Sequence, residues 1–562
     1  MSEQLGGQPI KKQSFLQGTA ILALGTILVK LMGFLFKTPL NNIIGSTGFG
    51  YFNSAYDVYN VLLMISTTGL PVAMSRMISE AQALGNEAQI RRIFKTAIYV
   101  FLAIGIVGSL VMLVFCKPLS VLVSNSENSW AAIAALAPCV LLICLISAYR
   151  GFFQGQSNMT PTSVSQVFES ITRLVVGLAL AWLIMKLTGE QTIRENGLVL
   201  APGESALDYG DMTLAAGGAI LGVTLGCLVS VLYLHGKFRK ASAALTASAA
   251  GTPKTGKATM KELLSIAVPI TLGSAGLQII NLFDTMIYMR RLEDGLGWSV
   301  ARAESLKGVY NYQQTIFALP CAFIPTITIA CIPAITAALT RKDEVGVRAT
   351  EESALRTMAL ISMPCAAGLF CMAEPVIRLL CRYDAQEMAV AVPMLSILGL
   401  AVIFNSLVLL LNAFMQAHGD VTSPVINMLI GGIVKIAVNF VLVGIPSINI
   451  VGAPAGTLVC YIVITLLNIL SLRKSVKGGL PIFRNLIRPL LASAIMGAAT
   501  FMVYRVLAHY LPSMKLACLV SLVFAVCVYV VLAVALRCIT YEDCMLLPKG
   551  EKIAKILRIR QK

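Results

Sequence analysis

Long apolar segments follow one another through almost the whole of this 562-residue chain, separated by short loops. Hydrophobic residues make up 57% of the chain and charged residues 13%, and the mean hydropathy is +0.80. Because a helix of about 20 apolar residues crosses the hydrocarbon core of a bilayer, the sequence predicts an all-α integral membrane protein with about fourteen transmembrane helices. The expected spans are residues 14–36, 52–75, 94–115, 130–149, 162–187, 213–235, 263–289, 309–338, 354–374, 388–415, 422–444, 451–472, 486–508 and 515–537.

Charge in the loops predicts the orientation. The loop at 236–261 holds six basic residues and no acid, whereas the loop at 188–212 holds five acids and a single base, Arg194. Since Lys and Arg are enriched in cytoplasmic loops, we expect the loop at 236–261 and both termini to be cytoplasmic. Lys11 and Lys12 precede the first span without a small-residue cleavage site, which favours a retained helix over a signal peptide.

Several kinds of chemistry find no support in the sequence. The fourteen cysteines are scattered through apolar segments without a CxxC pair, which is typical of buried, reduced thiols. His235, His418 and His509 lie far apart, so we expect no metal. We find no phosphate-binding Gly-rich loop, no nucleophile elbow and no insertion large enough for an ATPase. We therefore predict a protein that is not an enzyme, uses no cofactor and binds no nucleic acid.

An internal repeat predicts the architecture. The segment from Tyr149, YRGFFQGQSNMTPTSVSQVFESITRLV, is similar to the segment from Leu411, LNAFMQAHGDVTSPVINMLIGGIVKIA, at a constant offset of about 262 residues. Six spans separate the copies, so two six-helix halves of equal orientation are expected, in a parallel pseudo-twofold repeat with two extra C-terminal helices. The expected parts are a first half at 1–236, a basic linker at 237–261, a second half at 262–472, helices 13 and 14 at 486–537 and a basic tail at 538–562, which we expect to face anionic lipid.

Ionisable residues inside the spans mark a candidate transport site, because each costs about 3 kcal/mol at a helix centre unless it faces a cavity. The candidates are Lys30, Lys37, Asp57, Glu169 and Arg173 in the first half and Asp284, Gln313 and Lys435 in the second, with Gln278, Asn281, Asn311 and Gln314 nearby.

Structural alternatives exist for some of these residues. Glu169 and Arg173 are four residues apart and could neutralise each other on one helix face. Lys37 and Asp57 could reach the membrane interface instead of a cavity. Lys30 has no acid within a helix turn, and neither has Lys435, so these two favour an anion site.

The first spans and the eighth carry a family resemblance. The segment SFLQGTAILALGTILVKLMGFLFKTPLNNIIG from Ser14 and the segment GVYNYQQTIFALPCAFIPTITIACIPAITAAL from Gly308 resemble MurJ-type lipid II flippases, most of all the Gram-positive branch with the stage V sporulation protein B group. The resemblance implies a flippase that moves undecaprenyl-pyrophosphate-linked peptidoglycan precursor across the cytoplasmic membrane. It also implies a central cavity with basic residues and a groove for the lipid tail at helices 13 and 14.

Position by position, the resemblance is incomplete. Lys30 matches a basic position of the family's first helix, and Lys37 matches a basic position of the Gram-positive branch. Phe36 stands where many members have arginine, and Tyr312 stands where several Gram-positive relatives have arginine. The substrate therefore stays open between a peptidoglycan precursor and another undecaprenyl-linked oligosaccharide, such as a capsule or teichoic precursor. A cation-coupled multidrug exporter is a third hypothesis, for which an acidic cavity would be expected, and a non-transporting scaffold is the remaining one. We expect the protein to be a monomer. We expect transport to be driven by an ion, by the membrane potential or by downhill flux of the substrate.

Overall fold

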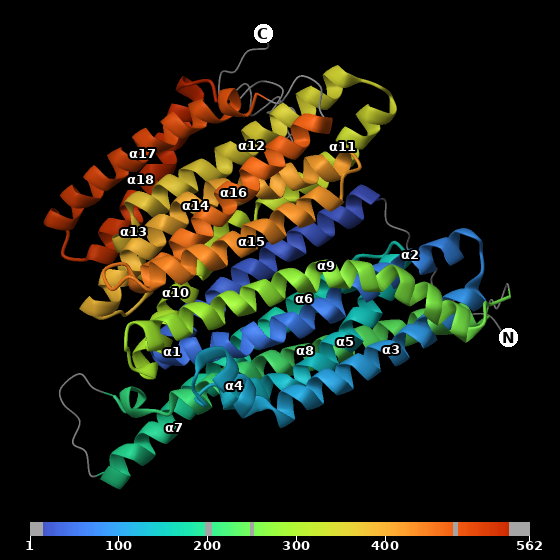
Figure 1. Ribbon diagram of the computed structural model, residues 1–562, viewed down its shortest axis with the longest axis horizontal. Coiled ribbons are helices and arrows are strands. Elements are labelled where there is room, and N and C mark those ends of the chain that lie inside the picture. Colours follow the sequence, from blue (N-terminus) through green and yellow to red (C-terminus); the bar gives the residue numbers. More distant parts are fainter. Residues whose placement is uncertain (1–14, 197–204, 248–251, 476–480, 539–562) are drawn as a thin grey trace, which may run out of the picture. The chain divides into compact units, whose positions relative to one another are not determined.

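A computed structural model describes residues 15–196, 205–247, 252–475 and 481–538, which form helices joined by short turns and contain no strand (Figure 1). The predicted all-α class is thus confirmed. Lys11, Lys12, Glu204 and the basic tail from residue 539 lie outside the described residues.

The chain divides into two compact units, which we call the N-terminal unit, Met1–Asn311, and the C-terminal unit, Tyr312–Lys562. The division falls inside α10, Val300–Cys321, so this helix belongs to both units. The halves expected from the sequence repeat have other bounds, 1–236 and 262–472, and remain a prediction about the repeat.

The N-terminal unit begins with a helical stretch that covers the first two expected spans. α1 runs from Phe15 to Met64, but Gly45 has φ 69° and ψ 177°, so two helices meet there. A positive φ is readily adopted only without a Cβ atom, which explains the glycine. The stretch continues without a turn through the π-helical segment η1, Ile65–Gly69, into α2, Leu70–Ala83.

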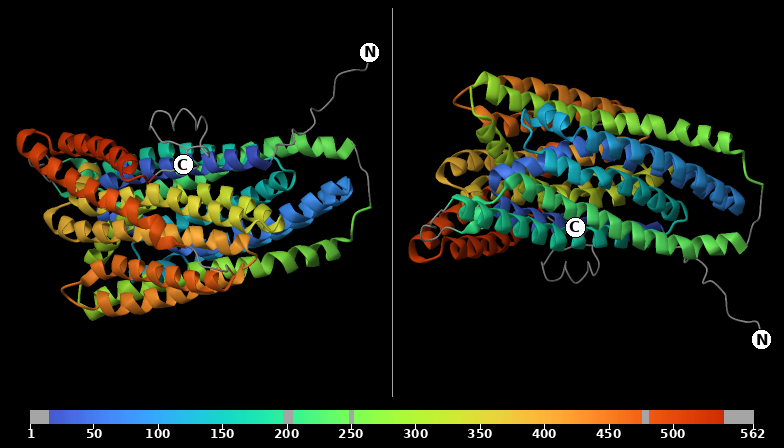
Figure 2. Two further views of the ribbon diagram at one scale, coloured as in Figure 1. Left: turned by 90° about the horizontal axis from the view of Figure 1, so that it is seen from above. Right: turned by 90° about the horizontal axis from the view of Figure 1, so that it is seen from below.

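The rest of the N-terminal unit is a bundle in which α5 packs against both α3 and α8, and its long helices run side by side (Figure 2). Its elements are α3 Glu87–Val114, α4 Cys116–Ser124, α5 Trp130–Gly155, α6 Thr160–Thr172, η2 Arg173–Gly177, α7 Leu178–Asn196, η3 Ala206–Tyr209, α8 Met212–Ala247, α9 Gly256–Arg290, η4 Arg291–Gly295 and the start of α10.

In the C-terminal unit, α14 packs against α11, α12 and α16 around a core that includes Leu355, Leu410 and Phe414. α17 packs along α12, where Gly497 lies against Cys371. The elements are α11 Ile324–Thr340, α12 Glu344–Cys371, α13 Ala373–Leu380, α14 Ala385–Ala417, α15 Thr422–Val443, η5 Asn449–Val451, α16 Gly452–Ser475, α17 Ile482–Tyr510 and α18 Met514–Ala535.

The two units repeat an order of elements. α3 and α12 are each 28 residues long, and each is capped by a side chain at its start, Asn86 or Asp343. A short helix follows in both cases, α4 or α13, and then a long one, α5 or α14. This recurrence agrees with the repeat seen in the sequence, and α17 and α18 follow it at the end of the described chain.

Twelve helical segments among the described residues are long and apolar enough to cross a membrane. The expected number of fourteen is not confirmed. Leu24–Met64 is one segment where the sequence predicts two spans, and α9, which covers the span expected at 263–289, is not among the twelve. The linker expected at 237–261 is also largely helical, because α8 runs to Ala247 through an Ala-rich sequence with high helix propensity.

Candidate functional site

A buried ion pair joins α1 to α10 in the N-terminal unit. The Lys307 side chain is fully buried, and its Nζ lies 2.9 Å from Asp57 Oδ2. Lys307 Nζ also donates a hydrogen bond of 2.8 Å to Ser54 Oγ, one turn before Asp57 on α1. Asp57 Oδ2 has no directed hydrogen bond, so the contact with Lys307 is primarily electrostatic. A buried lysine needs such a partner, because an isolated charge is expensive to remove from water.

Small residues allow α10 to approach α1 closely enough for this pair to form. A Cβ atom on Gly308 would overlap the Ser46 carbonyl oxygen, and one on Gly50 would overlap the Glu304 carbonyl oxygen. The hydroxyls of Ser46 and Ser305 are hydrogen-bonded at 2.8 Å in the same contact. The two backbones therefore touch over about one helical turn, from Ser46 to Gly50 on α1 and from Glu304 to Gly308 on α10.

Basic side chains gather beside the ion pair. Lys37 on α1 lies within electrostatic range of Arg173, Lys30 and Asp57. The Arg173 guanidinium carbon is 5.7 Å from the centre of the Phe36 ring, in a cation–π contact. The Arg173 Nε atom is buried without a hydrogen-bond partner, which leaves a donor for an anion to accept from.

The position of Arg173 depends on a local irregularity. It begins the π-helical segment η2, a feature that is frequent at functional sites. At the end of this segment, Gly177 lies directly against Gly222 of α8, where a Cβ atom would overlap the facing backbone. This close packing fixes the helix that carries Arg173.

The pairing of Glu169 differs from the alternative considered from the sequence. Glu169 Oε2 lies 3.2 Å from Arg150 Nη2 on α5, so its partner is Arg150 and not Arg173. Arg150 Nε also donates to Ser165 Oγ at 3.0 Å. A contact between two helices, and not the spacing of four residues along one helix, determines this pair, and Arg173 therefore keeps its charge available.

Asp284 is almost fully buried on α9, at 2% exposure. Its charge and that of Asp57 both act on Tyr288, so the acidic group of α9 lies in the same region as the ion pair. The rings of Tyr288 and Tyr310 meet edge to face, 6.1 Å apart, and are both buried. Aromatic rings thus exclude water from this part of the site.

The remaining candidates lie in the C-terminal unit or at its boundary. Gln313 is fully buried, and neither of its amide atoms has a hydrogen-bond partner within the described chain. Lys435 is half-buried on α15, and Tyr312 is fully buried. Of the eight candidates predicted from the sequence, six belong to the N-terminal unit and two to the C-terminal unit: Lys30, Lys37, Asp57, Glu169, Arg173 and Asp284, then Gln313 and Lys435.

Lys307 was not among the candidate site residues predicted from the sequence, because the eighth span was expected to begin at residue 309. α10 begins at Val300 instead, which places Lys307 inside the helix. A signal was present: Glu304, Lys307, Asn311 and Gln314 recur at helical spacing and form one polar stripe.

The described site has a positive balance. Lys30, Lys37 and Arg173 supply three positive charges, while Asp57 is paired with Lys307 and Asp284 adds one negative charge. Lys37 and Arg173 are half-buried and Lys30 is exposed. Guanidinium and ammonium groups bind phosphates and carboxylates most strongly where they are partly removed from water. The arrangement is suited to an anionic group, and it is poorly suited to an organic cation.

Comparison with known proteins agrees with the fold and with the resemblance of the first spans. The inward closed structure of the lipid II flippase MurJ matches with a TM-score of 0.66 at 13% identity, over 94% of this chain and 100% of that one. An inward-facing multidrug resistance transporter of the MATE family matches with a TM-score of 0.61, also at 13% identity, over 82% and 99%. At such identities the likeness shows the fold alone, which is that of membrane transporters.

Relatives from Bacillus subtilis (strain 168) match most of the chain. Stage V sporulation protein B is 26% identical over 82% of this chain and 84% of its own length. The lipid II flippase MurJ is 24% identical over 88% and 89%. Residues 307–441 match the MatE family, and residues 15–339, more than half of the chain, match another family model. That match shows that this multi-pass membrane protein belongs to the polysaccharide biosynthesis protein family.

Proposed function

We propose that the protein is a flippase for an undecaprenyl-diphosphate-linked glycan, with the peptidoglycan precursor lipid II as its first candidate substrate. The observation that carries this proposal is the positive cluster of Lys30, Lys37 and Arg173 beside an acid that is already paired. The flippase and sporulation relatives support the same class of substrate.

The chemistry of such a substrate fits the cluster. A diphosphate carries its charge over several oxygens, which accept hydrogen bonds from Arg and Lys in a site where water screens poorly. The polyprenyl tail can stay in the bilayer, so only the head group has to pass through the protein. A teichoic or capsule precursor shares the diphosphate and is the second candidate, whereas a cationic drug would be repelled.

Alternating access is the transport mechanism that we infer. The contact of α10 with α1 would close one end of the path in the described state, and its release would open that end. With no ATPase motif in the sequence, the energy would come from an ion, from the membrane potential or from downhill flux of the substrate.

Reconstituted transport would test the proposal directly. The purified protein in proteoliposomes should flip fluorescent lipid II, and Lys30→Glu should abolish flipping at unchanged protein level, because it replaces attraction by repulsion. Lys30→Arg keeps the charge and should retain most of the rate. Flipping of a teichoic-type precursor but not lipid II would select the second candidate. Unchanged flipping by Lys30→Glu would remove Lys30 from the site.

The orientation is proposed with the function. Residues 236–261 and both termini should be cytoplasmic, and residues 188–212 should lie outside. A membrane-impermeant thiol reagent should therefore label a cysteine placed at 204 in intact cells, and should label one at 254 only after lysis. The reverse pattern would invert the proposed direction of transport.

A further inference from the structure

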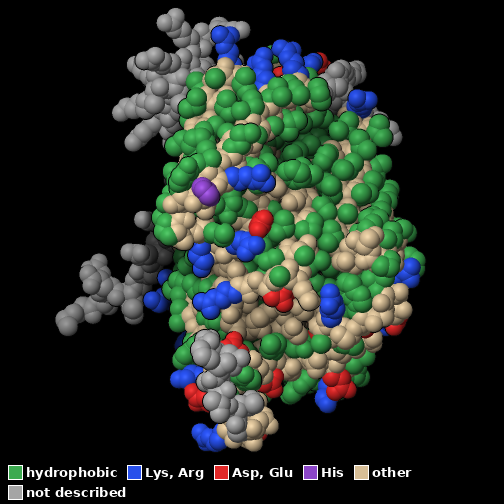
Figure 3. Space-filling model, turned by 90° about the vertical axis from the view of Figure 1, so that its left-hand side faces the viewer, with side chains coloured by type: hydrophobic (Ala, Val, Ile, Leu, Met, Phe, Trp, Pro, Cys, Tyr) green, Lys and Arg blue, Asp and Glu red, His purple; other side chains and the backbone are tan. Residues whose placement is uncertain are grey.

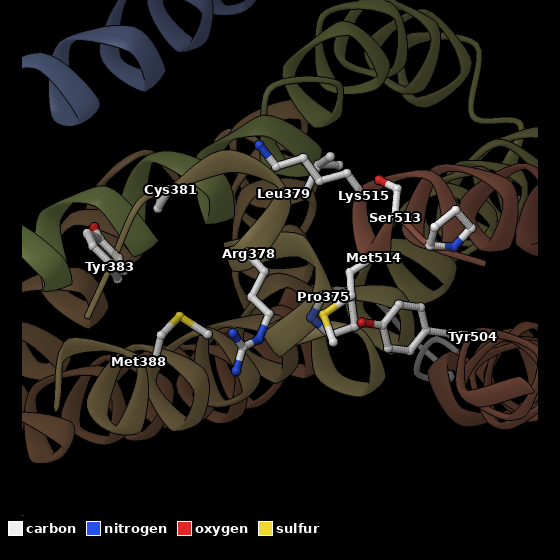
Figure 4. A pocket seen from close by; sticks show the side chains of 11 residues that line it. Pro375, Arg378, Leu379, Cys381, Tyr383, Met388, Tyr504, Ser513, Met514 and Lys515 are labelled. Atoms are coloured by element: carbon white, nitrogen blue, oxygen red, sulfur yellow. The ribbon is translucent and has the colours of Figure 1, made fainter. Parts of the chain in front are cut away.

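A pocket of about 430 Å³ lies in the C-terminal unit, at the end where α17 turns into α18. α13, the beginning of α14 and the α17–α18 turn line it (Figure 4). Its walls are mixed: Pro375, Leu379 and Met514 are apolar, while Arg378 and Lys515 are basic. Figure 3 shows a face on which Lys and Arg side chains are set among hydrophobic ones.

The two basic side chains come from different helices and extend in different directions in Figure 4. Lys515 is exposed and has no acidic partner among the described residues, and it stands in the first turn of α18. The helix dipole disfavours a cation at that place, so helix stability does not account for Lys515. An anion in the pocket would be attracted by Lys515 and by the positive end of the dipole together.

An ion pair positions Arg378 and leaves some of its N–H groups able to bind a ligand. Its Nε lies 2.9 Å from Glu374 Oε1, one turn earlier on α13, and both side chains are about half exposed. Such an exposed pair is weak, and a guanidinium has further N–H groups that can donate to a second acceptor. The acids at the start of α14, Asp384 and Glu387, are engaged in a capping box with backbone N–H groups.

An apolar hollow of about 390 Å³ lies farther along α18, lined by Leu519, Val520, Val523 and Phe524. Lys515, Leu519 and Val523 are four residues apart and therefore share one face of the helix. At 1.5 Å per residue, Leu519 lies about 6 Å and Val523 about 12 Å from the level of Lys515 along the helix axis. Val523 is 66% exposed, so this face is open to the surroundings of the unit.

We propose that this surface binds an anionic phospholipid, with the phosphate head group in the pocket of Arg378 and Lys515 and an acyl chain along the hollow of Leu519 and Val523. Two features follow each other along one face of α18. Lys515 supplies positive charge at the end of the helix, and the apolar hollow of Leu519 and Val523 follows at the depth where acyl chains would lie. A free phosphate would use the first feature and leave the second without a role. The site uses none of the basic residues proposed for head-group transport. It lies on α17 and α18, the expected helices 13 and 14, for which the resemblance implies a groove for the lipid tail of the substrate.

Lipid binding to the purified full chain tests the head-group pocket. Native mass spectrometry in detergent should show retained phosphatidylglycerol, and phosphatidylcholine should be retained at least about tenfold less. The double variant Arg378→Gln/Lys515→Gln should lose this preference, while Arg378→Lys/Lys515→Arg should keep most of it. Arg505→Gln is the matched control, because Arg505 is exposed on α17 near the same turn but does not line the pocket. Equal retention of both lipids, or equal loss in the control, would overturn the proposal.

Competition by inorganic phosphate distinguishes a lipid ligand from a free anion. Millimolar phosphate should displace phosphatidylglycerol weakly, because it lacks the acyl chain. If phosphate alone competed fully, the pocket would be a site for a free anion and the lipid proposal would be wrong.

A second pair of variants tests the acyl hollow. Val523→Trp should fill it and lower phosphatidylglycerol retention severalfold, whereas Val526→Trp should not. Val526 is 65% exposed on the same helix, nearly the same as Val523, and does not line the hollow. Similar retention by the two variants would show that the acyl chain does not lie there. None of these measurements uses transport, so their failure would leave the proposed flippase function untouched.

Discussion

At the scale of single residues, Asp57 and Lys307 form an ion pair whose lysine is fully buried. The Asp57 side chain is 25% exposed, so one charge depends on the other for its solvation. Breaking a buried pair leaves one charge uncompensated, while replacing both charges by neutral groups is often tolerated. The order of stabilities among single and double variants therefore identifies the role of the pair.

We expect Asp57→Asn to destabilise the protein by roughly 3 kcal/mol, because the buried Lys307 would lose its ion-pair partner. The double variant Asp57→Asn/Lys307→Met should recover most of the loss. Unfolding temperatures in detergent would show this order. The exposed pair of Arg76 and Glu80 is a control, and Glu80→Gln should change stability by less than about 1 kcal/mol. A double variant as unstable as Asp57→Asn would contradict this account.

The sequence predicted most members of the basic cluster but not their partners. Intramembrane charge is visible in any sequence, so Lys30, Lys37, Asp57 and Arg173 could be found. Lys307, the partner of Asp57, was not predicted. The start of α10 has low hydropathy, so the expected span began at residue 309, after Lys307. Contacts between helices that are distant in sequence leave no periodic signal.

At the scale of elements, the junction between α4 and η4 contains a buried carboxyl group. Asn125 Nδ2 donates a hydrogen bond of 2.6 Å to Glu293 Oε2, while Glu293 Oε1 is buried without a partner. Burial raises the pKa of Glu293 above the ordinary value of 4.5, and the hydrogen bond from Asn125 opposes this only in part. The folded protein therefore favours the protonated form more than the unfolded chain does.

The sign of the resulting pH dependence follows from that shift. The stabilising contribution of Glu293 is fully present below pH 4.5 and is lost as the pH rises through the raised pKa of the folded state. Glu293→Gln stays neutral and keeps an oxygen for Asn125, so its unfolding temperature should fall less with rising pH and should exceed that of the wild type at pH 7. Glu127→Gln, at an exposed site before α5, should follow the wild-type curve. A Glu293→Gln curve parallel to the wild type would mean that Glu293 does not titrate differently on folding.

At the scale of the whole molecule, periodicity and composition were sufficient for the all-α membrane class and for the order of its helices. The expected number of fourteen spans is not confirmed, and two helices that the sequence predicts as separate spans meet at Gly45 within one of the twelve apolar segments. Periodicity and composition also do not predict the division into two compact units. It depends on where α10 packs, and the glycine contacts of that helix with α1 involve Gly50 and Gly308, far apart in sequence.

α10 crosses the boundary between the two units, so its attachment to α1 bears on any motion that transport requires. Ser46 and Ser305 lie in this attachment, with their hydroxyl oxygens 2.8 Å apart. Cysteines at both places should form a disulfide on oxidation, because side chains at that separation meet its geometric requirement. We expect the oxidised Ser46→Cys/Ser305→Cys protein to stop flipping and to recover on reduction, since the cross-link would hold α10 on α1. The single-cysteine variants are the controls and should be insensitive to oxidant. Full transport by the cross-linked protein would show that this contact persists through the cycle and that the moving parts lie elsewhere.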